Sequence, residues 1–292
     1  MTAQAPPMRT AVPAPLQVSK QRLGAGSPIP LETVADGEQL TARFAADLHD
    51  EYVAAKQAGR QKVVFIVPVG PVGQFERFAA RCNAESLSLA DLVVINMDEY
   101  LTADGSDFIP TSDPLSFRRH MDERFYGLLR PDLAPPPAQR LFPDPGDLAA
   151  VPRAIRQFGG VDVCFGGVGI TGHVAFNDPP EPHETLSIEA FAALPTRVVT
   201  LSRETLLINS VTTCRGNIDR IPKLAVTVGM QEILGSRKVR LYLNRPWQSA
   251  IVRKILHGPV SERVPASLLQ RHADTRFVIT AEVAELPEPT LR

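Results

Sequence analysis

Cysteine is scarce in this chain of 292 residues, and the three that occur, Cys82, Cys164 and Cys214, are widely spaced. An odd number at such spacings forms neither a metal-ligand pair nor a disulfide framework, which indicates a reducing compartment. Long apolar runs are also missing, since none approaches the roughly 20 residues that cross a bilayer. The N-terminus has no compact apolar stretch of the secretory kind. These absences predict a cytoplasmic protein with no membrane contact and no metal site.

An excess of charge of either sign is absent too. The chain carries 31 basic and 32 acidic side chains, a formal net charge of -1, so no overall field attracts nucleic acid or an anionic membrane. Its 44% of apolar residues can bury a large core, near the upper size limit of one domain. We therefore expect one folded domain with a small-molecule partner. The oligomeric state is left open, with a homo-oligomer among the alternatives.

The first 27 residues are rich in Pro and Ala and show no apolar period. Such a segment buries too little surface to offset its ordering entropy, which predicts a flexible tail over 1–27 and a single domain over 28–292. From Glu38 to Gly59 apolar residues recur near helical spacing, and Gly59 stands where a C-cap glycine would. That pattern predicts a first long helix.

Short β-branched runs follow, and they are almost continuously apolar, as in strands covered on both faces. The predicted strands are Val63–Val67, Leu92–Met97, Val161–Gly166, Arg197–Leu201, Ala225–Val228, Val239–Leu243 and Phe277–Thr280. Helical patterns alternate with them at Pro114–Leu129, Asp147–Phe158 and Trp247–His257. Alternation of this kind predicts an α/β fold of three layers, a Rossmann-like, largely parallel sheet with helices on both faces. The long polar connections Thr102–Asp113 and Asn177–His183 are the expected active-site loops.

Two adjacent acids, Asp98 and Glu99, end one apolar strand. Neighbouring side chains on a strand point to opposite sides, so one acid can face a ligand crevice while the other turns away. The alternative is that either acid only caps the turn that follows.

A glycine-rich segment, Gly166–Pro179, follows another strand. Its four glycines within seven residues let the backbone approach a ligand and expose the polar side chains that follow. His173 is then placed to titrate near neutral pH, with Asp178 as a partner that fixes its tautomer. Gly167, Gly169 and Gly172 also match a dinucleotide-binding G-x-G-x-x-G, but that motif should open a helix, and Asn177–Pro182 is hard to place in one.

The two segments occur together and in order, and here the chain resembles a known family. Asn96–Leu101 is similar to the N-M-D-E-Y segment of glucosamine-6-phosphate deaminases, and Gly166–Pro179 is similar to their G-G-V-G-x-D-G-H-I-A-F-N-E-P segment. Flanking similarities at Ser116–Phe125, Thr196–Leu201 and Pro222–Gly229 extend the resemblance over roughly Leu31 to Ala284. The 6-phosphogluconolactonases share the fold and a G-x-D-G-H turn, but Asp98-Glu99-Tyr100 and Ala175-Phe176-Asn177 favour the deaminases.

The resemblance implies roles for particular residues. Asp98 would move a proton between C2 and C1 of the opened amino sugar, and His173 would assist ring opening. Asp178 stands where the family has a glutamate, and Thr171 where it has an aspartate, so the relay behind His173 is altered. None of these steps needs a metal or an organic cofactor. The substrate-binding surface is expected to include, besides the phosphate positions below, Glu99, Gly169, Gly172 and Asn177.

The phosphate-binding positions depart from the family. Its L-P-T-G-G/S-T-P loop is replaced by Val67–Gly73, in which Val69, Gly70, Pro71 and Val72 supply no hydroxyl and Pro71 has no N–H. Val211 stands at the position of the family's arginine, and Gln248 at that of its lysine. A phosphate dianion needs several charge-assisted donors, so these losses predict a site that does not require a 6-phosphate. Arg215 or Arg245 is the alternative source of the missing cation.

The sequence thus predicts an enzyme that deaminates and isomerises a sugar or amino sugar by enolisation, a hydrolase or isomerase of carbohydrate metabolism. A catalytically silent paralogue that binds a sugar or a protein partner is the alternative, motivated by Thr171 and the missing phosphate residues. A lactonase is a third possibility, in which His173 activates water. The residues do not name the sugar.

Overall fold

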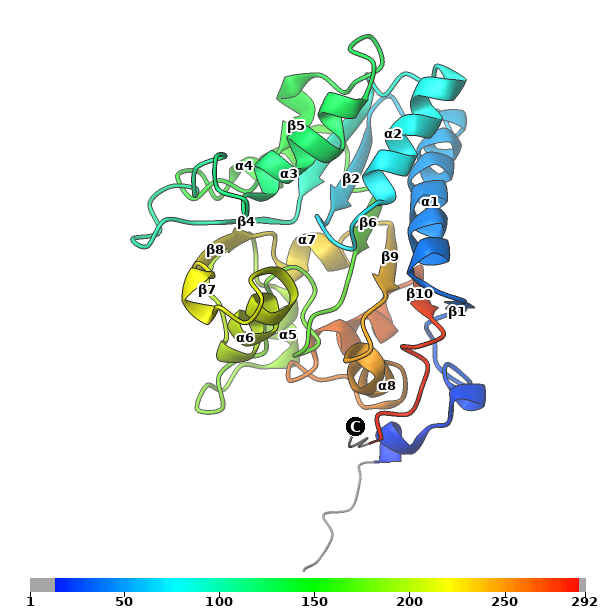
Figure 1. The fold of residues 1–292 in the computed structure, drawn as a ribbon, viewed down its shortest axis with the longest axis vertical. Coiled ribbons are helices and arrows are strands. Elements are labelled where there is room, and N and C mark those ends of the chain that lie inside the picture. Colours follow the sequence, from blue (N-terminus) through cyan, green and yellow to red (C-terminus); the bar gives the residue numbers. More distant parts are fainter. Residues whose placement is uncertain (1–13, 289–292) are drawn as a thin grey trace, which may run out of the picture.

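A seven-stranded sheet forms the centre of the molecule (Figure 1). The structure is a computed structural model, and it describes residues 14–288. All neighbouring strands of this sheet are parallel, in the order β1-β10-β9-β6-β2-β3-β5. The strands are β1 (Leu31–Val34), β2 (Val63–Val67), β3 (Leu92–Asn96), β5 (Arg140–Leu141), β6 (Val163–Gly166), β9 (Lys238–Leu243) and β10 (Thr275–Thr280). The predicted α/β fold with a parallel sheet is therefore confirmed.

Helices cover both faces of the sheet. Helices α1, α2 and α3 pack on one face, and α4, α5, α7 and α8 contribute to the core on the other. Their bounds are α1 (Gly37–Gln57), α2 (Gln74–Glu85), α3 (Phe117–Arg124), α4 (Ala150–Gln157), α5 (Ile188–Ala192), α6 (Arg203–Thr213), α7 (Met230–Leu234) and α8 (Gln248–His257). None of the helices between residues 14 and 288 combines the length and apolar character that a membrane crossing needs.

Strand alternation explains why the sequence shows unbroken apolar runs. In β2, Val63, Phe65 and Val67 point into the core beneath α1 and α2, whereas Val64 and Ile66 point into the opposite core. Successive side chains of a strand face opposite sides, so a strand covered on both faces must be apolar at every position. The long predicted helix corresponds to α1, whose Phe44 stacks on Tyr242 of β9 with ring centroids 3.9 Å apart.

A second, three-stranded sheet lies beside the first, and here the sequence interpretation needs correction. Strands β4 (Asp98–Tyr100), β8 (Leu224–Thr227) and β7 (Arg197–Thr200) pair antiparallel in the order β4-β8-β7. We expected the last two segments in the parallel sheet. Residues of β7 alternate between partly buried and exposed, the pattern of a strand with one face toward solvent. Only the long-range pairing of β7 with β8, and of β8 with β4, assigns these strands to a separate sheet.

Residues 14–27, which precede β1, contact the folded domain. Two 3₁₀ helices, η1 (Ala14–Gln17) and η2 (Lys20–Arg22), pack near α8, where the buried Arg253 donates to the Val18 carbonyl (2.8 Å) and the Gly24 amide donates to His257 Nε2 (3.0 Å). The predicted flexible tail therefore differs from the structure over residues 14–27, because backbone carbonyls and amides, which composition does not reveal, anchor this stretch. Residues 1–13 lie outside the described residues.

Candidate active site

A cleft of about 390 Å³ opens at the carboxyl ends of the parallel strands. Its walls come from Pro68–Val72 after β2, Met97 and Asp98 after β3, Gly167–Gly169 after β6, and Asn244, Arg245, Trp247 and Gln248 after β9. Open α/β sheets bind ligands at this edge. The two loops that we expected here, Thr102–Asp113 and Asn177–His183, do not line the cleft; short turns directly after the strands do so instead.

Asp98 lies on the floor of the cleft at the start of β4. It is 9% exposed, and no hydrogen bond from another group of the described chain reaches its carboxyl oxygens. Burial, together with the neighbouring charge of Glu99, raises the pKa of Asp98 to about 8. A carboxyl group held without partners beside an open cleft can accept a proton from a bound molecule.

Glu99 points to the opposite side of the strand and does not line the cleft, which corrects its assignment to the substrate surface. It is fully buried and accepts hydrogen bonds from Ser116 Oγ (2.9 Å) and from the amides of Phe117 (3.0 Å) and Arg118 (2.9 Å). These groups form the first turn of α3. A carboxylate at a helix N-terminus satisfies free N–H groups and opposes the positive end of the helix dipole, so Glu99 fixes α3 against β4.

The glycine-rich segment brings His173 into the cleft. A Cβ atom on Gly169 would stand 1.9 Å from His173 Nε2, so only glycine lets the imidazole lie against this turn. Gly169 lines the cleft. Gly172 does not, and its φ of +88° shows that its role is to form the left-handed turn before His173. No helix follows the segment at Asn177–Pro182, so the dinucleotide-binding interpretation fails.

Behind His173 lies a cluster of hydrogen-bonding side chains. His173 Nδ1 is 2.6 Å from Asp178 Oδ1, and the Thr171 hydroxyl donates to the same oxygen (2.7 Å). The Thr205 hydroxyl lies 3.0 Å from each Asp178 oxygen, and the Ser202 amide donates to Oδ2 (3.2 Å). With Nδ1–H donating to the carboxylate, His173 presents Nε2 as an acceptor toward the cleft.

The charge state of Asp178 follows from these contacts. Burial by itself would raise the pKa of Asp178, but the charge of His173 and the hydrogen bonds from His173, Thr171 and Ser202 together lower it well below its usual range. Asp178 is therefore a carboxylate at neutral pH. The sequence motifs did not identify Thr205. This residue lies on α6, 27 positions beyond Asp178 in the chain, and no local pattern relates the two.

Asn177 was expected on the substrate surface, but it is fully buried and lies outside the cleft. Its Nδ2 donates to the carbonyls of Val174 and Val228 (both 2.9 Å), and its Oδ1 accepts from Arg197 (2.7 Å). The side chain thus joins the glycine-rich segment to the small sheet. An amide that satisfies three partners at once is a structural link in this fold.

The expected phosphate positions divide into two groups. Val69, Gly70, Pro71 and Gln248 line the cleft. The Gln248 side chain is held within the protein, since its Nε2 donates to the Val168 carbonyl (2.7 Å) and its Oε1 accepts from the Arg245 amide (2.8 Å).

Val211 does not line the cleft and is 59% exposed. The face of α6 that lines the cleft carries Asn209, Thr212 and Thr213. Val211 lies between them in the sequence, but it projects from another side of the helix. Arg215 is also absent from the walls. Within residues 14–288, Arg245 is the one arginine or lysine that lines the cleft. No hydrogen bond or ion pair of its guanidinium group to the described residues is found.

Comparison with known proteins identifies the family. No protein-family model matches the chain. A glucosamine-6-phosphate deaminase from Halothermothrix orenii is 30% identical over 222 residues, which is 74% of this chain and 83% of that protein. The chain belongs to the glucosamine-6-phosphate deaminase family. Glucosamine-6-phosphate deaminase 1 from Bacillus subtilis is 29% identical over 262 residues, 87% of this chain and 97% of that protein.

Solved structures agree with this family assignment. A monomeric glucosamine-6-phosphate deaminase superposes with a TM-score of 0.71 at 27% identity, covering 88% of this chain and 99% of that one. A 6-phosphogluconolactonase from Trypanosoma brucei gives a TM-score of 0.59 at 16% identity, covering 88% and 97%. The similarity to the 6-phosphogluconolactonase shows that the deaminase family shares its fold with lactonases. It gives no information about activity. Within residues 14–288 no group of three or more His, Cys, Asp or Glu side chains is arranged to hold a metal ion.

Proposed function

We propose that this protein is an isomerising deaminase of amino sugars, which converts a 2-amino-2-deoxy aldose and water into a ketose and ammonia. The observation that carries the proposal is one cleft that holds both an unpartnered carboxyl group, Asp98, and a histidine, His173, oriented by a buried carboxylate. A base beside a C–H group and a separate proton relay are what enolisation of a ring-closed sugar needs.

Ring opening is assigned to His173. Its Nε2 accepts the proton of the anomeric hydroxyl and returns a proton to the ring oxygen as the C1–O5 bond breaks, which leaves the aldehyde. Asp178 supports this step because its carboxylate holds the Nδ1–H and stabilises the imidazolium that forms transiently.

Proton transfer from C2 is assigned to Asp98. The carboxylate takes the C2 proton while the C1 carbonyl oxygen gains a proton, which gives a 1,2-enolamine. The acid then returns its proton to C1 as the nitrogen lone pair forms a C2=N double bond, and water adds to this imine and displaces ammonia. With a pKa of about 8, only about one Asp98 in ten is ionised at pH 7 in the free protein. The ammonium group of a bound amino sugar would favour the ionised base.

We further propose that the substrate does not require a 6-phosphate. Val69 and Pro71 offer no side-chain donor, and the amide of Gln248 is already engaged. Among residues 14–288, Arg245 is the one arginine or lysine of the cleft wall that a phosphate group would meet. One exposed guanidinium contributes about 1 kcal/mol, or roughly fivefold in binding.

The test measures ammonia release from glucosamine 6-phosphate and from glucosamine, with the native protein and with Arg245→Gln. We expect the two sugars to differ in kcat/KM by no more than about tenfold, and Arg245→Gln to remove that difference. A preference of a thousandfold or more that Arg245→Gln abolishes would show that this arginine rebuilds a phosphate site. Binding of either sugar without any ammonia release would favour the catalytically silent alternative.

A further inference from the structure

A second cavity, of about 490 Å³, lies at the other end of the sheet. It is bordered by Ser236 and Arg237 just before β9 and by His272 and Ala273 just before β10, whereas the catalytic cleft follows the carboxyl ends of the strands. Strand β9 alone has six residues, which separates the two sites by about 20 Å at roughly 3.3 Å per residue. The second cavity is therefore independent of the catalytic machinery.

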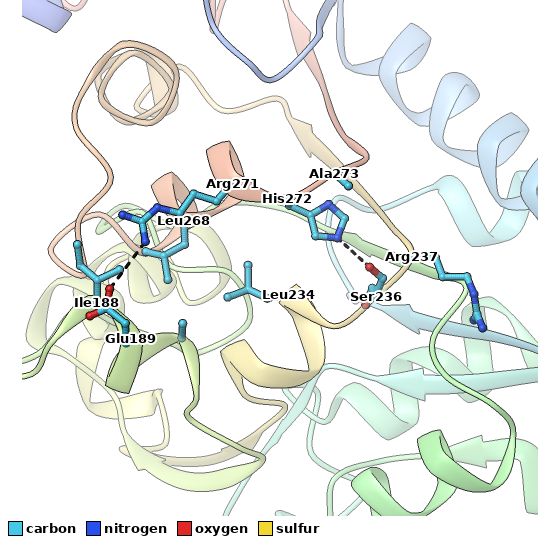
Figure 2. Close-up of a pocket in the computed structure, with 10 residues that line it drawn as sticks. Ile188, Glu189, Leu234, Ser236, Arg237, Leu268, Arg271, His272 and Ala273 are labelled. Atoms are coloured by element: carbon cyan, nitrogen blue, oxygen red, sulfur yellow. Dashed lines mark hydrogen bonds and ion pairs between the residues drawn. The ribbon is translucent and has the colours of Figure 1, made fainter.

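The floor of this cavity is apolar. Ile188 and Ala192 of α5, Leu234 of α7 and Leu268 of the 3₁₀ helix η6 (Pro265–Arg271) supply it. Figure 2 shows Leu234 and Leu268 between the Arg271–Glu189 pair on one side and His272 with Ser236 on the other. Three of these side chains, Ile188, Ala192 and Leu234, are only partly buried against the core. A hydrocarbon or ring placed there would remove their remaining apolar surface from water.

Two arginines and one glutamate lie at the rim of the cavity. Arg271 makes only a long contact of 4.0 Å with Glu189, and their side chains are 59% and 79% exposed. Arg237 stands at the other end, donating to Asp162 and to the Gly159 carbonyl. Glu189 is the one acidic side chain among the lining residues. Because Arg271 is weakly paired, it can exchange Glu189 for a better anionic partner.

The imidazole of His272 forms a fixed wall. Its Nε2 donates to the Ser236 carbonyl (2.8 Å), and its Nδ1 accepts from the Asp274 amide (3.2 Å). Both ring nitrogens are thus engaged within the protein, so the face of the ring is what a ligand can contact. Pre-formed cavities of 300–1,000 Å³ with apolar walls and a few polar groups at the rim are typical small-molecule sites.

We propose that this cavity binds a small amphipathic carboxylate, with its apolar tail on Leu234 and Leu268 and its carboxylate on Arg271. The apolar floor selects the tail, and Arg271, whose partner Glu189 is 4.0 Å away, selects an anion over a neutral or cationic head group.

Octanoate is a suitable probe, with 1-octanol and octylammonium as neutral and cationic molecules of the same chain length and butyrate as a short-chain anion. Calorimetric titration of the full chain is expected to show octanoate binding at least about tenfold more tightly than each of the other three. Backbone amide signals of Ser236, Arg237, His272 and Ala273 should shift in the NMR spectrum on titration.

Arg271→Gln tests the head-group contact, because this exposed side chain can be replaced without disturbing the core. It should weaken octanoate binding about fivefold to tenfold, leave octanol binding unchanged and leave ammonia release unchanged. Arg156→Gln is the matched control, since Arg156 is an exposed arginine outside the cavity and its loss should have no effect. Equal binding of octanoate and octanol, no loss with Arg271→Gln, or shifts confined to other amides would each overturn the proposal.

Discussion

At the scale of single residues, the proposed chemistry depends on two carboxyl groups in opposite situations. Asp98 has no hydrogen-bonding partner from other groups of the described chain and a pKa raised to about 8, whereas Asp178 is surrounded by donors and its pKa is lowered. Burial acts on both, and at Asp178 the charge of His173 together with the hydrogen bonds outweighs it. A proton acceptor and a permanently charged orienting group therefore arise from the same type of side chain.

Replacing Asp98 by asparagine should abolish turnover while keeping the fold. The amide has nearly the same shape but cannot accept the C2 proton, and loss of a general base costs about 100-fold to 10,000-fold in rate. Ammonia release and thermal unfolding of the native protein and of Asp98→Asn measure the two effects. Native turnover in the variant would show that Asp98 only serves the turn after β3.

The ionisation of Asp98 should also appear in the pH dependence of activity. The base must be unprotonated, so kcat/KM should rise about tenfold per pH unit below pH 8 and level off above it, as the cited pKa of about 8 requires. A rate profile that is already flat from pH 6 would exclude Asp98 as the group that takes the proton.

The raised pKa of Asp98 also affects stability. Rising pH should increase the activity but decrease the free energy of unfolding. The folded protein keeps the Asp98 proton up to about pH 8, while the unfolded chain releases it near pH 4. Unfolding therefore releases a proton between these values, and the free energy of unfolding falls as pH rises through this window. Asp98→Asn has no proton to release at this position. In denaturant titrations, the free energy of unfolding of the variant minus that of the native protein should therefore rise by at least about 1 kcal/mol between pH 5 and pH 8.5. A difference that stays constant with pH would contradict the raised pKa.

At the scale of elements, α6 connects the proton relay to the wall of the cleft. Its first turn brings Thr205 to Asp178, and its later turns place Asn209, Thr212 and Thr213 in the cleft. Asn209 also donates to the Tyr100 hydroxyl (3.1 Å) beside β4. The orientation of His173 and the shape of the substrate wall thus depend on the same helix.

Thr205→Val should reduce activity through the relay, because the isosteric side chain keeps the packing and removes the hydroxyl that contacts both Asp178 oxygens. We expect kcat to fall about tenfold with little change in KM, together with a change in the pH profile, and Thr205→Ser to restore most of the activity. If the valine and serine variants lost activity equally with an unchanged pH profile, Thr205 would be a packing residue only.

At the scale of the whole molecule, a fully buried arginine joins distant parts of the chain. Arg253 of α8 donates to the carbonyls of Val18, Ser249, Ala284 and Glu285. One guanidinium therefore holds the segment before β1 and the segment after β10 to the same helix. Its five N–H groups in a planar fork suit several carbonyls at once, which a lysine could not match.

Arg253→Met should destabilise the protein by about 3 kcal/mol or more, because several buried carbonyl oxygens lose their donors. Limited proteolysis should cut within residues 14–27 in the variant before the core is digested, and denaturant unfolding should give the loss of stability. Lys20→Gln, which removes an exposed ion pair with Glu285, is the control and should change little. Unaltered proteolysis of Arg253→Met would show that other contacts hold this segment.

Local patterns in the sequence determined the layers of the fold and the main pair of site residues. Apolar runs and helical periods depend on neighbours a few positions away, so they predicted most strands of the parallel sheet. The glycine-rich segment predicted a His173 that reaches the cleft beside Asp178, although the side chain is largely buried there. Strand alternation also required the side chains of Asp98 and Glu99 to point to opposite sides. It did not determine which of the two would face the cleft.

Tertiary structure decided the rest, because these features depend on residues far apart in the chain. Only the pairing of β4 with β8 created the second sheet and turned Asp98 toward the cleft, while α3 drew Glu99 away from it. The orientation of α6 about its axis keeps Val211 out of the cleft and places Thr205 beside Asp178. Buried polar partners made Asn177 a structural link outside the cleft, and they hold the Gln248 side chain in the wall of the cleft. Such long-range contacts satisfy buried hydrogen-bonding groups, and no local sequence pattern records which distant partner will do so.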